Sequence, residues 1–232
     1  MATLTPTKDT GGSTKATPTV YAEPDRQMPA ETLTQFMPGA GLNSAFLAEL
    51  FSGVLAHERC GRHLYKSCEA RTMSPALKAK YEEFGAETER HVEILEQLIT
   101  DAGGSPMYVG PTARAVLGSD TNLVESTFVL SGSVDPVTAE LAMLDAVFLA
   151  ESMDQANWTL LAQLAAQLDD TPWGEPLRAA VDEVLEQEAE HLTWATRTKA
   201  QLVTLQASSD GVARLSDSDG ELVDHIQAWS ID

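Results

Sequence analysis

The sequence predicts an all-α protein built on a bundle of four long helices, and three observations support this fold class. Between about residues 41 and 206, apolar residues return every three or four positions, which is the period of an amphipathic helix. Runs that alternate apolar and polar residues, as strands do, are almost absent. A long segment with scattered glycine, proline and serine, residues 103–136, divides the helical stretches into two pairs.

The first pair of helices has recognisable ends. The first helix is expected from about Leu42 to Glu69. The second begins after Ser74 and Pro75, a cap residue followed by proline at the first helical position. It is expected to end at Gly103, because glycine is favoured just beyond the last turn of a helix.

The second pair follows the same plan. The third helix is expected to begin near Asp135-Pro136 and to end near Asp169, and the fourth to run from about Gly174 to Leu205. Each of the four helices is long enough to reach about 30 Å at 1.5 Å per residue.

The connections between the helices predict the topology. Short loops join the helices within each pair, so each pair is expected to form an antiparallel hairpin. A loop as long as residues 103–136 argues against a simple up-down-up-down bundle. We expect it to carry the chain back along the bundle, so that a long crossover joins two antiparallel hairpins.

The two ends of the chain have a different composition. Residues 1–40 are rich in threonine, proline, glycine and serine, and they are expected to form a flexible tail. Residues 41–206 form the bundle. Residues 207–232 are an acidic extension with a short amphipathic turn around Leu222, Ile226 and Trp229, which packs either on the bundle or on a partner.

Charge and hydropathy exclude some classes of function. The formal net charge of −20 would repel nucleic acid phosphates and anionic lipids. No window approaches the roughly 20 apolar residues of a membrane span. The N-terminus lacks the apolar run of a secretory signal, and two cysteines are too few for a disulfide framework. We therefore expect a cytoplasmic protein with no nucleic acid or membrane partner.

Carboxylates interrupt the apolar face of the first and third helices. Glu58 follows Leu55 by three residues, and Glu151 follows Phe148 by three. The segments that end in these glutamates, GVLAHE and AVFLAE, are similar, which indicates an internal repeat of the helical hairpin.

The second and fourth helices add a histidine to a carboxylate. Glu188 and His191 are three residues apart, and Glu87 and His91 are four apart. Both spacings keep the two side chains on one face of a helix. The second helix departs from the fourth because Thr88, not glutamate, stands three residues before His91.

The energetics of burial indicate what such a set of residues does. Four ionised carboxylates in a dry core would repel one another. Burying each of them would cost on the order of several kcal/mol unless cations neutralise their charge. Two divalent cations balance four carboxylates, and neutral imidazoles add ligands without charge. A mixed oxygen and nitrogen set suits iron or manganese. The predicted metal ligands are Glu58, Glu87, His91, Glu151, Glu188 and His191.

This pattern resembles the ferritin-like superfamily of di-iron and di-manganese carboxylate proteins, which includes ferritins, rubrerythrins and manganese catalases. The resemblance covers about residues 41–206 and is strongest in Glu151 and in EAEH at 188–191. It implies a ferritin-like four-helix bundle with two iron ions, or alternatively manganese. By this resemblance, Glu58 and Glu151 correspond to the glutamates that two of the helices contribute alone. The pairs Glu87 with His91 and Glu188 with His191 correspond to the glutamate and histidine that each of the other two helices contributes.

The resemblance also implies an oxidoreductase that oxidises Fe(II) or acts on oxygen or peroxide. A catalase-like or peroxidase-like enzyme would use the same ligands. A non-enzymatic, structural or stress-related binding protein with a vestigial or structural metal site is the alternative. Thr88 leaves a mononuclear or asymmetric site open. Assembly into a homo-oligomer is also open, although an iron-storage cage is disfavoured by the two extensions.

Other residues near the predicted ligands are given simpler roles. His57 and His63 lie off the apolar face of Glu58 and are expected at the surface, and Asp154 is expected to be an ordinary polar residue. Tyr65 and Trp158, two turns after Glu58 and Glu151, are expected to pack in the core.

Overall fold

The computed structural model of the chain describes residues 30–129 and 134–207, and within these ranges it is all-helical. Four long helices run the length of the molecule: α2 (Ser44–Arg71), α3 (Pro75–Asp101), α5 (Pro136–Gln167) and α6 (Gly174–Ala207). A short helix, α1 (Ala30–Leu33), precedes them, and α4 (Pro111–Val129) separates the two pairs. None of the described helices has the length and apolarity needed to pass through a membrane.

The helix ends agree with the cap residues in the sequence. Ser74 caps α3, because its hydroxyl oxygen accepts a hydrogen bond from the amide of Leu77 at 3.2 Å. Asp135 caps α5 in the same way, accepting from the amide of Thr138 at 3.0 Å. Gly103 follows α3 with a φ of 81°, a conformation that glycine adopts without strain.

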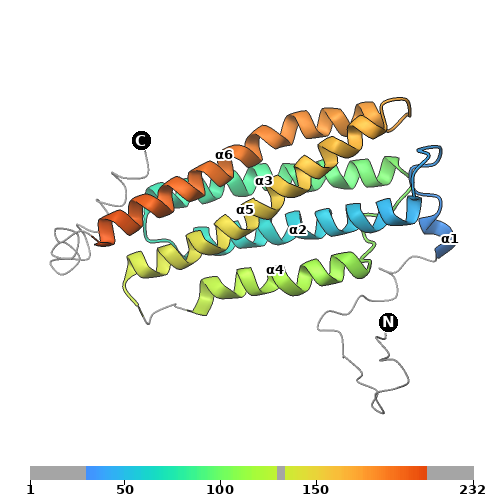
Figure 1. Cartoon of the computed structure of the whole chain (residues 1–232). Helices are drawn as coiled ribbons and strands as arrows, with labels where there is room; N and C mark the ends of the chain where they lie inside the picture. The colour runs from blue at the N-terminus through green and yellow to red at the C-terminus, as the bar shows by residue number, and fades with distance from the viewer. Residues whose placement is uncertain (1–29, 130–133, 208–232) are drawn as a thin grey trace, which may run out of the picture.

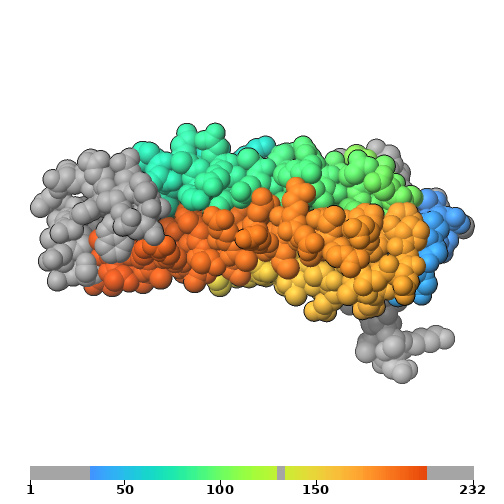
Figure 2. All heavy atoms as spheres, turned by 90° about the horizontal axis from the view of Figure 1, so that it is seen from above, coloured from blue at the N-terminus to red at the C-terminus, as the bar shows by residue number. Residues whose placement is uncertain are grey.

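The long helices form two hairpins, as predicted. Helix α3 runs back along α2, and α6 runs back along α5 (Figure 1). Seen from above, α3 and α6 lie side by side (Figure 2). Helix α2 also contacts α5, so that all four long helices enclose a common interior.

The segment between the hairpins differs from the predicted loop. It returns the chain along the bundle as expected, but much of it is a helix, α4, which packs on α2 and α5 (Figure 1). The buried residues of α4 are Ala113, Asp120 and Thr127, which are small or polar. They give no apolar periodicity, and packing against α2 and α5 stabilises this helix instead.

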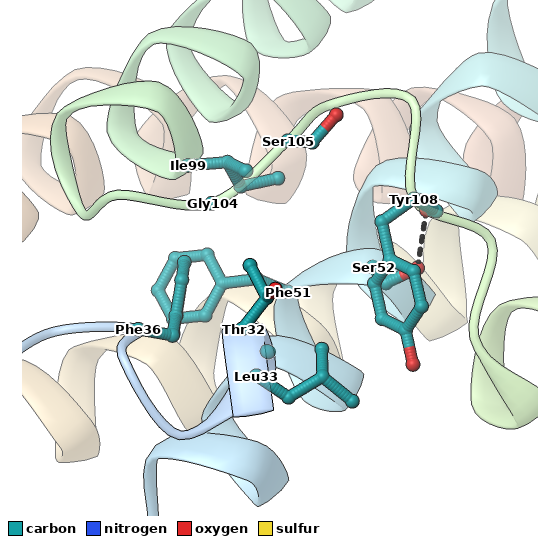
Figure 3. Close-up of a pocket in the computed structure, with 10 residues that line it drawn as sticks. Thr32, Leu33, Phe36, Phe51, Ser52, Ile99, Gly104, Ser105 and Tyr108 are labelled. Atoms are coloured by element: carbon teal, nitrogen blue, oxygen red, sulfur yellow. Dashed lines mark hydrogen bonds between the residues drawn. The ribbon is translucent and has the colours of Figure 1, made fainter. Parts of the chain in front are cut away.

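The last part of the predicted N-terminal tail lies within the described residues and packs on the bundle. Residues 1–29 lie outside the described part, but Phe36 and Met37 are buried against the end of the bundle. The Phe36 ring packs edge-on against Phe51 with 5.6 Å between centroids, in a small apolar hollow that Leu33 also lines (Figure 3). Isolated apolar residues give no period, so the sequence pattern missed this contact. The C-terminal extension lies outside the described residues beyond Ala207.

The apolar core is divided into two clusters along the bundle axis. Leu55 and Val184 belong to the cluster at the α1 end, while Leu64 and Ala195 belong to the cluster at the other end. The segments between these residues on α2 and α6 bring buried polar side chains into the interior. The fold therefore places a polar layer between two apolar ones.

Candidate metal centre

Five buried residues from four helices meet in the polar layer. They are three carboxylates and two imidazoles, and each is at most 2% exposed. Helix α2 contributes Glu58, α3 contributes His91, α5 contributes Glu151, and α6 contributes Glu188 and His191.

Glu188 joins two groups of ligand atoms into one cluster. Glu58, His91 and Glu188 form the first group, and Glu151, Glu188 and His191 the second. Within each group the ligand atoms all lie within 4.8 Å of one another. These are the only such groups in the described residues, so the structure assembles five of the six residues that the sequence singled out.

The ring of His91 is oriented from both sides. Its Nε2 lies 2.8 Å from Oε1 of Gln187, which accepts the hydrogen bond. Its Nδ1 points into the cluster, 2.8 Å from Oε1 of Glu188 and 3.7 Å from Oε2 of Glu58. A neutral ring with its proton on Nε2 therefore presents the Nδ1 lone pair to the cluster.

The ring of His191 has the matching arrangement. Its Nε2 donates to Oε2 of Glu87 at 2.6 Å. Its Nδ1 lies 3.3 Å from Oε2 of Glu151 and 4.0 Å from Oε2 of Glu188. The two imidazoles lie 6.1 Å apart between centroids and are close to parallel.

Two aromatic side chains hold the outer oxygens of the glutamates. The Tyr65 hydroxyl donates to Oε1 of Glu151 at 2.7 Å. The Trp158 indole N–H donates to Oε1 of Glu58 at 2.5 Å. Both aromatic residues are buried in the core, as predicted, but each also contacts a carboxylate of the opposite hairpin.

The inner atoms of the cluster have no hydrogen-bond partner. This holds for Oε2 of Glu58, Glu151 and Glu188 and for Nδ1 of His91 and His191. Even the 2.8 Å separation between His91 Nδ1 and Glu188 Oε1 lacks the alignment of a hydrogen bond. Buried polar atoms are rarely left unpaired. These five atoms therefore face one another inside the cluster, and none of them forms a hydrogen bond.

The cluster perturbs the ionisation of its members. Burial opposes a charged imidazole, but the carboxylates of Glu188 and Glu58 outweigh it and raise the pKa of His91 to about 11. His191 is shifted in the same direction, against burial, by Glu151 and Glu87. Burial and the neighbouring carboxylates raise the pKa of Glu188. In Glu151, His191 overcomes the effect of burial and lowers the pKa. Without a cation, the neighbouring carboxylates therefore favour the protonated form of both imidazoles.

Glu87, the sixth predicted ligand, lies outside both groups. Its carboxylate contacts Nε2 of His191, the ring nitrogen that faces away from the cluster, and its side chain is 31% exposed. Thr88 occupies the buried position beside it, and its hydroxyl donates to the backbone oxygen of Phe84 at 2.8 Å. With a spacing of four residues from Glu87 to His91, the Glu87 carboxylate thus reaches the outer nitrogen of His191 and not the inner ligand atoms of the cluster.

His57 is not at the surface, contrary to the prediction. It is buried, its Nδ1 lies 2.6 Å from Oδ2 of Asp120, and its Nε2 lies 3.1 Å from the backbone oxygen of Ala150. Burial opposes protonation, but Asp154 and Asp120 raise the pKa of His57 to about 12. Asp120 belongs to α4, so the sequence pattern that missed this helix also missed the partner of His57. His63 is exposed, as predicted.

Asp154, expected to be an ordinary polar residue, is a buried neighbour of the cluster. Its Oδ2 lies 3.4 Å from Nε2 of His57, while its Oδ1 has no hydrogen-bond partner. Burial raises the pKa of Asp154 to about 7, even though His57 acts in the opposite direction. The spacing of one turn after Glu151 was the sequence signal that placed it on this face.

The family of the chain can be stated at this point. Residues 42–208, more than two thirds of the chain, match the model of the family described as "Domain of unknown function (DUF892)". The chain belongs to the DUF892 family. All five residues of the cluster lie within the DUF892 match. No curated protein and no solved structure matches the chain.

Proposed function

We propose that this DUF892 protein is a ferritin-like carboxylate protein that binds two divalent metal ions in the polar layer and acts as an oxidoreductase. The observation that carries the proposal is the set of five buried ligand atoms without hydrogen-bond partners. A buried polar group without a partner is costly, and a metal ion would satisfy several of these atoms at once.

The charge of the cluster supports a pair of cations. Glu58, Glu151 and Glu188 contribute three negative charges when ionised, in an interior from which solvent is excluded. Asp154, which also has an unpartnered oxygen, lies beside them and can supply a fourth. Two divalent ions would neutralise this set without charged imidazoles.

The donor atoms favour iron or manganese. Carboxylate oxygens together with imidazole nitrogens suit these ions, whereas calcium favours all-oxygen shells and structural zinc favours thiolates. Cys60, two residues after Glu58, is half-buried, and burial raises its pKa to about 11, which disfavours a thiolate ligand. Both imidazoles offer Nδ1 to the site and have Nε2 held by a second residue, an arrangement that is common for metal-binding histidines.

The topology supports the ferritin-like assignment. Two antiparallel hairpins with a crossover that returns along the bundle are typical of ferritin-like folds. Here α4 forms that crossover, and the candidate ligands come from all four long helices.

The residues of this chain would orient the site and keep water out. Glu87 and Gln187 fix the two imidazole rings, while Tyr65 and Trp158 fix one oxygen each of Glu151 and Glu58. Apolar clusters on both sides exclude solvent. Bound iron or manganese would supply the redox chemistry, either the oxidation of Fe(II) with oxygen or peroxide as the electron acceptor or the breakdown of peroxide.

Metal titration of the full-length protein tests the proposal. Metal-free protein is titrated anaerobically with Fe(II) or Mn(II), and oxygen or peroxide is then admitted. We expect two ions per chain and oxidation of Fe(II) or breakdown of peroxide. Glu188→Gln should lose the binding, whereas Glu186→Gln, an exposed control on the same helix, should keep it.

Two results would change the proposal. Failure of the wild-type protein to bind either ion, with the fold intact by circular dichroism, would contradict the metal site. Binding without turnover of Fe(II) or peroxide would instead favour the alternative function, a non-enzymatic protein with a structural metal site. Thr88, where a fourth glutamate would stand in a symmetric cluster, is the observation that favours this alternative.

A further inference from the structure

Helix α5 has an apolar face that no described part of the chain covers. Leu149, Met153 and Leu160 are 53%, 53% and 50% exposed, and Ala156 between them is also exposed. These four residues, which we call the α5 seam, lie on the side of the helix opposite the buried Glu151 and Trp158. The seam therefore belongs to a different surface from the candidate metal centre.

The spacing of the seam indicates that its partner is a helix. The intervals between its residues are four, three and four, a spacing that keeps side chains on one face of a helix. A narrow apolar stripe with this spacing is typical of a helix that packs against another helix. An isolated exposed leucine would need no explanation, but a stripe that spans three turns does.

The stretch of α5 that carries the seam has no exposed charge of its own. Between Asp145 and Asp169, the only charged residues of α5 are Glu151 and Asp154, and both are buried. Helices α3 and α6 differ, since they carry many exposed carboxylates. These include Glu82, Glu83, Glu93, Glu183, Glu186 and Glu190. Two molecules that each have a net charge of −20 could approach closely at the uncharged face of α5 and not at the acidic one.

The order of side chains in the seam is self-complementary. If two copies of α5 run antiparallel about a two-fold axis between residues 154 and 155, Leu149 faces Leu160 of the second copy. The same axis places Met153 opposite Ala156, which pairs a long side chain with a short one. A symmetric dimer needs one patch that fits itself, and this seam meets that requirement.

We propose that the α5 seam is the interface of a symmetric dimer in which two copies of this chain pack α5 against α5 in antiparallel orientation. The interface is apolar and lacks ion pairs, so salt screens the repulsion between the acidic copies without weakening their contact. The proposal does not depend on the metal centre.

Sedimentation equilibrium of the full chain over micromolar to millimolar concentrations tests it. We expect a mass near twice the 25.0 kDa of the chain, with a dimer fraction that increases when salt is added. Leu160→Glu should give monomers at every concentration. Val203→Glu, a control at an apolar residue of α6 with similar exposure, should leave the dimer intact. A monomeric wild type, as would follow if the segment after Ala207 covered the seam, or a dimeric Leu160→Glu variant, would overturn the proposal.

Cysteine cross-linking tests the antiparallel pairing. Leu149→Cys/Leu160→Cys should form a disulfide-linked dimer under mild oxidation, because each new cysteine faces its counterpart on the second copy. Each single variant should remain unlinked, since identical residues would lie about 16 Å apart along the helix axis. The wild type, with Cys60 half-buried and Cys68 buried, provides the background. Cross-linking of a single variant to the same extent, or none in the double variant, would contradict the pairing.

Discussion

The two hairpins of the bundle have the same plan but contribute unequally to the buried cluster. Each has a glutamate on its first helix and a histidine on its second, and each holds the other's histidine through Nε2. The second helix of the α5–α6 hairpin adds Glu188, where the α2–α3 hairpin has Thr88. The two hairpins therefore provide equivalent outer supports for the imidazoles, while only the α5–α6 hairpin places a carboxylate at this position.

A second difference lies one turn further along the first helix of each hairpin. Asp154 follows Glu151 by three residues, whereas Gly61 follows Glu58 by three. The two positions are neighbours, since a Cβ built on Gly61 would lie 3.8 Å from an oxygen of Asp154 and 3.5 Å from a methyl of Thr88. The α5–α6 hairpin therefore supplies most of the carboxylates of the cluster. In the α2–α3 hairpin, Gly61 has no side chain and leaves space beside Asp154.

The largest effect should come from alanine substitutions at the two unequal positions, Glu188 and Thr88. Glu188→Ala removes the one residue that both ligand groups share, so we expect metal uptake and metal-dependent oxidation to be lost. Thr88→Ala should retain both, because the Thr88 hydroxyl donates only to its own helix. Metal content after gel filtration measures the difference. Full metal-dependent oxidation by the Glu188→Ala variant would show that the metal site lies elsewhere.

The two outer supports of the imidazoles should have a smaller effect on metal affinity. Glu87→Ala and Gln187→Ala each remove the acceptor for one Nε2–H, and such losses typically weaken metal binding by about 10–100-fold. The Glu87 variant should lose more, because a carboxylate is the stronger acceptor. Competition with a chelator measures both affinities. A loss of all binding in Glu87→Ala would instead indicate that Glu87 is a ligand, as the sequence first predicted.

Substitutions of Tyr65 and Trp158 test whether the two hydrogen bonds between the hairpins stabilise the metal-free protein to the same extent. Tyr65→Phe and Trp158→Phe each deprive a buried carboxylate oxygen of its donor. We expect each change to lower the free energy of unfolding by about 1–3 kcal/mol, with an added packing loss for Trp158. Urea denaturation of the metal-free protein gives these values. Unchanged stability in both variants would show that the two contacts do not hold the carboxylates.

The smallest effect is expected at Gly61. A Cβ there meets only ordinary van der Waals contacts, so Gly61→Ala should fit and should stabilise the helix by up to about 1 kcal/mol. Gly53→Ala on the same helix is the contrasting change, since its Cβ would lie 2.9 Å from a methyl of Thr112 on α4. Thermal unfolding of the two variants should separate them. A large loss of stability in Gly61→Ala would mean that the space beside Asp154 is tighter than described.

The sequence predicted the parts of the fold that depend on local signals. Ser74 and Asp135, each followed by proline, marked two helix starts to within a residue. The periodic apolar stripes placed Glu58, Glu151 and Glu188 in the interior. Helix α4 was missed because its buried residues are small or polar, and tertiary packing determines such a helix.

The sequence predicted the residues at the centre of the candidate site but not the residues that surround them. A helical period shows which face a residue occupies, but not which side of a neighbouring ring it reaches, so the position of Glu87 outside the cluster could not be foreseen. Gln187 gave no signal because an uncharged residue at a helix edge is unremarkable in sequence. The environment of His57 depended on Asp120 of α4, a contact between distant segments.

Anomalous scattering from crystals soaked with Mn(II) or Fe(II) tests the central claim most directly. We predict two peaks about 3.5–4 Å apart, both within the cluster of Glu58, His91, Glu151, Glu188 and His191. A fully soaked crystal with no peak among these residues, or with its ions bound only at the acidic surface, would contradict the claim.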